Sequence, residues 1–171
     1  MPRWVKSVPL SASYRKAMLL LHILFSVGWT GAVAAFLVLA LTGLYGSSAV
    51  EARAIYIAME PMTTWLIVPL AFLSLVTGVI QALATPWGLF RHYWIVIKFL
   101  INLVSLPLLL LHTRMIHRMA EAATSGALPV NALYEDRVHL VVASGMSLAA
   151  LVVATLLSVY KPKGRLLQPG H

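Results

Sequence analysis

Four long stretches of apolar residues, separated by more polar segments, dominate the pattern of this chain. Each stretch reaches the length of about 20 apolar residues that a helix needs to cross the ~30 Å hydrocarbon core of a bilayer. Lys98 is the one Lys, Arg, Asp or Glu within them. The pattern predicts an all-α fold, a polytopic four-transmembrane-helix bundle that forms a single integral membrane domain over residues 1–171. The expected spans are residues 17–43, 63–85, 93–113 and 138–160.

The segments between the spans carry their own signals. Residues 49–60 are expected to form a short surface helix before Pro61, and residues 114–137 form the longest and most polar loop. Pro86 and Gly88 oppose helix continuation and predict a tight turn at 85–88. The methionines near the first and third loops are expected to pack rather than to bind metal; they are Met59, Met62, Met115 and Met119.

Charge adds an orientation to this picture. Thirteen Lys and Arg residues stand against five Asp and Glu, a formal net charge of +8. All five acids fall in the first and third loops. The basic residues outside those loops are Arg3, Lys6, Arg15, Lys16, Arg91, Lys98, Lys161, Lys163 and Arg165. Because short cytoplasmic loops are enriched in Lys and Arg, we expect both termini in the cytoplasm and the protein in the bacterial inner membrane.

Composition then excludes several classes of protein. The chain is 60% hydrophobic and only 11% charged, against about 25% charged residues in soluble domains. A soluble domain is thereby excluded, and the basic excess fits anionic lipid rather than nucleic acid. The absence of cysteine excludes disulfides, thiolate catalysis, cysteine-ligated iron–sulfur clusters and covalently attached haem. No hydrolase motif is present.

Polar residues within the spans are the candidate site, because ionisable groups in membrane helices face the bundle or a wet cavity. Lys98, Asn102, Ser105, Leu109 and His112 recur at helical spacing along one face of the third span. His22, Ser26 and Trp29 form a comparable stripe in the first span, and the second span offers Gln81. His22, Gln81 and Lys98 lie at similar depths of roughly 6–9 Å from the cytoplasmic edge and are expected to meet.

A second polar layer is expected near the opposite face. His112 ends the third span and His139 begins the fourth. Arg114, His117, Arg118 and Glu60 are candidates for the same region. Lys98 and His112 are about 21 Å apart along a helix, so the two layers are distinct.

These layers suit three kinds of function. Imidazoles on facing helices can hold one or two haem b groups, while Lys or Arg pairs with the propionates. Such a site fits an electron-transfer protein or a membrane oxidoreductase that works with a redox partner or a quinone. A copper or other metal site could use His22, His112 and His139. A cofactor-free transport or scaffold protein could use the same stripe for a solute path or for packing.

Several strings resemble known bacterial membrane families. Thr85-Pro86-Trp87-Gly88-Leu-Phe-Arg91-His92-Tyr93-Trp94 is similar to a recurring stretch in a family of four-span integral membrane proteins, a domain of unknown function. Leu21-His22-Ile23, Gly28-Trp29-Thr30-Gly31 and Trp94-Ile-Val-Ile-Lys98 more distantly resemble the HemJ-type protoporphyrinogen oxidases, with a related layout in the copper-resistance D membrane domain. The oxidase resemblance implies haem b, with His22 as a ligand and Lys98 as an essential partner. The Asn-Glu-Pro motif that the oxidases carry before their fourth span is absent here.

Overall fold

The protein is a bundle of four long helical rods. The computed structural model describes residues 11–46, 48–84, 92–125 and 134–161, and every element within them is helical. The elements are α1 (Ala12–Tyr45), α2 (Ala49–Met62), the π-helical segment η1 (Thr63–Ile67), α3 (Val68–Ala84), α4 (Tyr93–Ser125) and α5 (Tyr134–Tyr160). The elements α2, η1 and α3 form one continuous rod, and all four rods are long and apolar enough to cross a membrane. The predicted all-α four-helix membrane bundle is confirmed.

Part of the sequence-based expectation lies outside the described residues. This holds for the last residue of the second span, Thr85, for the turn at 85–88, and for five of the basic residues that predicted the orientation. Those five are Arg3, Lys6, Arg91, Lys163 and Arg165.

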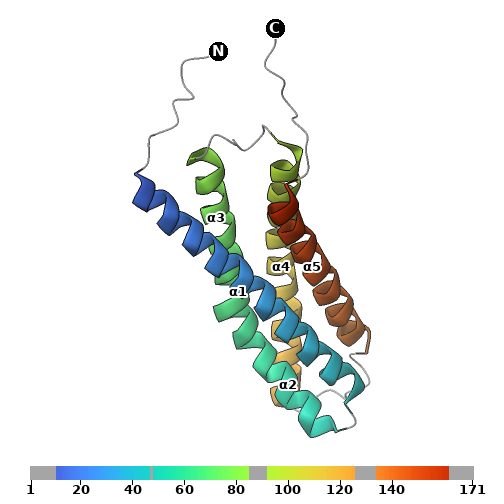
Figure 1. The fold of residues 1–171 in the computed structure, drawn as a ribbon. Coiled ribbons are helices and arrows are strands. Elements are labelled where there is room, and N and C mark those ends of the chain that lie inside the picture. Colours follow the sequence, from blue (N-terminus) through green and yellow to red (C-terminus); the bar gives the residue numbers. More distant parts are fainter. Residues whose placement is uncertain (1–10, 47, 85–91, 126–133, 162–171) are drawn as a thin grey trace.

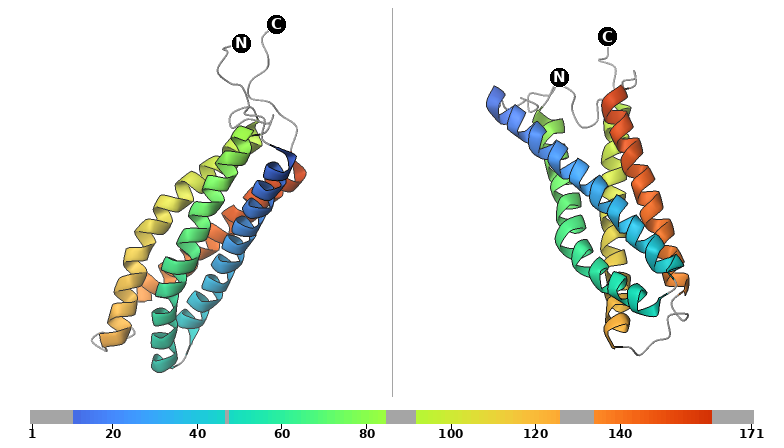
Figure 2. Two further views of the ribbon diagram at one scale, coloured as in Figure 1. Left: turned by 90° about the vertical axis from the view of Figure 1, so that its left-hand side faces the viewer. Right: turned by 60° about the horizontal axis from the view of Figure 1, so that its bottom comes forward.

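The rods form a closed ring of neighbours (Figures 1 and 2). Helix α1 packs against α3 and α5, and α4 packs against the same two helices. Helix α2 packs against α1 and α4. One end of the bundle, here called the terminal end, contains the start of α1, the end of α3, the start of α4 and the end of α5. Helix α2 lies at the other end, here called the α2 end.

The helices extend beyond the predicted spans. Helix α1 has 34 residues and α4 has 33, so each is about 50 Å long, whereas the hydrocarbon core is ~30 Å thick. The expectation of a loop over 114–137 is wrong at both ends, since α4 continues to Ser125 and α5 begins at Tyr134. Met115, Ile116 and Met119 are buried at helical spacing in this extension. Its polar residues lower the mean hydropathy of the segment. Because they face outward, the helix continues through them.

The helix expected on the surface over 49–60 is instead packed into the bundle. Its N-cap is Ser48, whose Oγ accepts a hydrogen bond from the Glu51 amide at 3.4 Å. Ala52, Tyr56 and Met59 are buried along one face. Pro61 lies inside the helix and supplies no amide proton, and the π-helical turn of η1 follows directly. The rod thus continues through a proline instead of breaking there.

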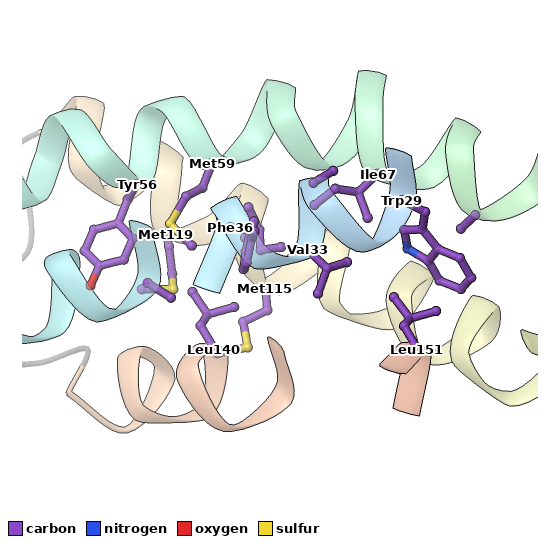
Figure 3. Packing of buried hydrophobic residues seen from close by; sticks show 14 of the residues in the cluster. Trp29, Val33, Phe36, Tyr56, Met59, Ile67, Met115, Met119, Leu140 and Leu151 are labelled. Atoms are coloured by element: carbon purple, nitrogen blue, oxygen red, sulfur yellow. The ribbon is translucent and has the colours of Figure 1, made fainter. Parts of the chain in front are cut away.

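The main core runs along the bundle and is densest at the α2 end (Figure 3). Trp29, Val33 and Phe36 of α1 line its axis. Met59 and Met119 are the least exposed of the large side chains, at 0% and 1%. Together with Met115 they pack in this cluster, which confirms that these methionines serve packing. Outside the core, large apolar side chains cover the helices, as expected for a surface that meets lipid.

A buried cation at the α2 end was not anticipated from the sequence. Arg137 of α5 is 8% exposed, and its guanidinium lies 5.4 Å from the centroid of the Tyr56 ring. The Tyr56 ring in turn lies against Gly43 of α1, where an added Cβ would be 2.8 Å from the tyrosine oxygen. Gly43, Tyr56 and Arg137 therefore stack three helices together.

Replacing Gly43 with alanine is expected to destabilise the bundle by about 1–3 kcal/mol, because the new methyl group overlaps the buried Tyr56 ring. Gly31→Ala is the matched control, since no atom lies within 4 Å of a Cβ at that position of the same helix. Thermal unfolding in one detergent measures both. A melting temperature for Gly43→Ala equal to that of Gly31→Ala contradicts the close approach of α1 and α2.

Candidate functional site

A cavity of about 720 Å³, here called cavity 1, lies among α1, α3, α4 and α5 in the terminal half of the bundle. Its volume falls within the range of about 300–1,000 Å³ typical of cofactor and ligand sites. Most of its wall is apolar. Six of the residues selected from the sequence line it: His22, Ser26, Trp29, Gln81, Lys98 and Asn102. The structure thus brings the expected terminal-end cluster into one cavity.

The His22 ring is held by a hydrogen bond across the bundle. Its Nδ1 lies 3.1 Å from Oγ1 of Thr77. The Thr77 hydroxyl has one proton, which it donates to the Leu73 carbonyl at 2.6 Å, so it accepts from His22. The neutral ring therefore carries its proton on Nδ1 and has a lone pair on Nε2. In metal-ligating histidines the ring nitrogen that does not bind the metal, here Nδ1, usually donates its proton to an oxygen acceptor.

Gly78 makes room for that ring. A Cβ at this position would lie 3.1 Å from Cε1 and 3.6 Å from Nδ1 of His22. The imidazole consequently rests on the bare backbone of α3, one residue after the threonine that fixes its tautomer. Gly78 therefore packs directly against a candidate ligand.

Cations surround the polar part of the cavity. Lys98 Nζ lies 5.2 Å from the centroid of the Trp94 ring, and both residues line cavity 1. Arg15 and Lys161 also line it, and the described lining contains neither Asp nor Glu. A ligand with an anionic end and an apolar body matches this wall.

Two amides in the wall are incompletely satisfied. Gln81 Nε2 and Asn102 Oδ1 are buried without a hydrogen-bond partner, while Asn102 Nδ2 donates to the Lys98 carbonyl at 2.8 Å. Buried polar atoms without partners cost on the order of 1–3 kcal/mol each. Both residues line cavity 1, although the unpartnered atoms themselves are buried.

The two histidines of the second polar layer, His112 and His139, also come together, but in a different geometry from the one expected. His112 Nε2 and His139 Nε2 are 3.4 Å apart, and the rings meet edge to face with centroids 5.1 Å apart. If His112 and His139 were to hold one haem together, the macrocycle would have to fit between their rings. These rings touch each other directly, so the pair as arranged here does not fit a second haem.

The other residues of that layer are spread over the surface. Arg114 is exposed and lines neither of the two cavities described here. His117 of α4 pairs with Glu60 of α2, with Nδ1 and Oε1 2.5 Å apart. This pair ties two helices together at the exposed surface and is separate from the His112–His139 contact.

Metal binding by protein side chains alone finds little support. Within the described ranges, no three or more His, Asp, Glu or Cys side chains are grouped so that they could hold a metal ion. His22 lies in the terminal half, and the His112–His139 pair lies in the α2 half. The three candidate metal ligands therefore do not form one site.

The residues of cavity 1 do fit haem b. Nε2 of His22 is suited to iron, and the apolar wall is suited to the macrocycle. Arg15, Lys98 and Lys161 are suited to the propionates. No second histidine occurs among the described lining residues, so His22 is the candidate for the one protein imidazole.

Comparison of the chain with protein-family models, with curated proteins and with solved structures finds no match. The function is therefore inferred from the cavities and the side chains that line them.

Proposed function

We propose that this multi-pass membrane protein is a b-type haem protein that moves electrons within or across the bilayer, with the haem in cavity 1. The observation that carries the proposal is the hydrogen bond between Nδ1 of His22 and Thr77, because it leaves Nε2 with a lone pair on a residue that lines a cavity with three basic side chains and no described acid. Haem b supplies a reversible one-electron couple when bound.

Each group in the wall has a distinct task in this proposal. His22 binds the metal, and Thr77 fixes the ring orientation and increases the basicity of Nε2. Lys98, Arg15 and Lys161 hold the carboxylates at the terminal end, and Trp29 closes the inner end with its buried indole. The apolar side chains exclude water from the site.

We place the terminal end toward the cytoplasm of a bacterium, in its inner membrane, because Arg15, Lys16 and Lys161 flank the helices there while the acids of the described chain lie toward the α2 end. The carboxylates of the cofactor would then lie near the cytoplasmic headgroups. The orientation is tested with a reporter enzyme that is active only outside the cytoplasm, fused to the C-terminus. Activity of this fusion would contradict the orientation.

The direct test is an absorption spectrum. The full chain is produced with haem supplied during growth, purified in detergent, and measured in the oxidised and the dithionite-reduced states. We expect about one haem for each chain, with a Soret band that shifts on reduction. A colourless protein after haem loading would overturn the proposal and favour a cofactor-free transport or scaffold role.

A further inference from the structure

A second cavity, of about 550 Å³ and here called cavity 2, lies between α4 and α5 in the α2 half of the bundle. Val33 and Phe36 of α1 and Ile67 of η1 close its inner side. Several of its lining residues are about half exposed or more on the apolar outer surface of the helices; these are Leu100, Val104, Leu108, Val142 and Met146. A ligand can therefore enter sideways from the membrane.

Cavity 2 differs from cavity 1 in charge. Its described lining contains no Lys, Arg, Asp or Glu, and His112 and His139 are its two ionisable residues. A phosphate, carboxylate or ammonium head group would find no opposite formal charge here. The wall suits a neutral amphiphile with an apolar body and a polar group near the histidines.

The hydrogen bonds of the two histidines run in one direction. His112 Nδ1 lies 2.6 Å from the Leu108 carbonyl, which can only accept, so Nδ1 carries the proton. Nε2 of the neutral ring is then an acceptor, and the proton in the 3.4 Å contact belongs to His139 Nε2. The nitrogen left with a free lone pair is Nδ1 of His139. The neutral pair thus presents an acceptor to a ligand.

The buried hydroxyls around the cavity have the same bias. Thr63 donates to the Met59 carbonyl at 2.8 Å, and Ser144 donates to the Leu140 carbonyl at 2.6 Å. Their protons are used within their own helices, and only lone pairs remain for a ligand. The Ser105 and Ser147 hydroxyls also line cavity 2 and can donate as well as accept, so the preference for a ligand that donates hydrogen bonds rests on Nδ1 of His139.

We propose that cavity 2 binds the head ring of an isoprenoid quinol, with a ring hydroxyl donating to Nδ1 of His139 and the tail lying along the lipid-facing side of α4 and α5. The ring is neutral, its hydroxyls are donors, and its apolar body matches the wall. The oxidised quinone has carbonyls in place of those hydroxyls, so it loses the bond to His139. Quinol binding does not depend on haem in cavity 1.

The test measures binding to the haem-free full chain in phosphatidylcholine nanodiscs under anaerobic conditions. Calorimetric titration with decylubiquinol is expected to give one site, with affinity about tenfold higher than for decylubiquinone, the effect of one hydrogen bond. His139→Phe keeps a ring but removes both nitrogens, and it is expected to abolish the preference for the reduced form. His117→Phe is the matched control, because His117 is exposed on α4 and lines neither cavity.

A variant that fills the mouth of cavity 2 provides a second, independent test. Val142→Trp fills the lipid-facing mouth and is expected to weaken both redox forms at least tenfold, even if His139→Phe fails to fold. Equal binding of quinol and quinone, an unchanged preference in His139→Phe, or displacement of the quinol by equimolar decanol each overturns the proposal. Quinol binding by a protein that takes up no haem would support this site and contradict only the haem site.

Discussion

Haem content is expected to fall to background when His22 is replaced by alanine. His22 is the one histidine among the described residues that line cavity 1, and its Nε2 is the candidate ligand atom. The loss should exceed the ~10–100-fold reduction in affinity that removal of an outer-shell partner causes. The measurement is the ratio of haem to protein after loading, from the reduced-minus-oxidised spectrum.

Thr77→Val supplies a graded comparison within the same site. Valine has the shape of threonine but cannot accept from Nδ1, so affinity should fall by about 10–100-fold without complete loss. His117→Ala, on the exposed surface of α4, should retain full haem content. If His22→Ala keeps its Soret band while a different histidine variant loses it, His22 is not the ligand.

The second large effect is expected from Gly78→Leu. A Cβ there lies 3.1 Å from Cε1 of His22, so an alanine already pushes the ring, and a leucine displaces it and enters cavity 1. Haem content should fall to nearly the level of His22→Ala, although no ligand atom has been removed. The helix itself should tolerate the change, because leucine favours helices by up to about 1 kcal/mol over glycine.

The matched control is Gly145→Leu on α5, where an added Cβ meets nothing within 4 Å. It should bind haem like the wild type. Thermal unfolding of the apoproteins separates loss of the site from loss of the fold. A Gly78→Leu protein with normal haem content would show that the His22 ring is not where the ligand binds.

The bundle was predictable because membrane spans are encoded locally, in runs of apolar residues. Hydropathy failed at residues 114–125, where the apolar positions are confined to one face and the polar residues lower the average. It also missed the burial of Arg137, since a lone arginine near a loop is ordinarily exposed and only the tertiary packing supplies the Tyr56 ring. Both errors occur where a helix is no longer apolar on all sides but remains packed in the bundle.

The candidate site was partly predictable for a similar reason. Equal depth in neighbouring helices was enough to group His22, Gln81 and Lys98, which line one cavity. Depth alone does not define how two rings face each other. His112 and His139 lie at matching depths, as expected, but they touch edge to face rather than flanking a space. The role of Thr77 depends on which acceptor its hydroxyl uses, which no sequence pattern specifies.

The length of the helices has a consequence for what holds the molecule together. The segments 49–62, 114–125 and 134–137 extend past the apolar spans at the α2 end, and they contain Tyr56, Met59 and Met119. A helix of about 50 Å exceeds the ~30 Å hydrocarbon core, and where these segments project into water, burial of apolar area contributes to stability as it does in a soluble protein. Within the lipid this driving force is missing and close packing must replace it. We therefore expect the α2 end to be stabilised mainly by burial of apolar area and the terminal half mainly by close packing of the helices.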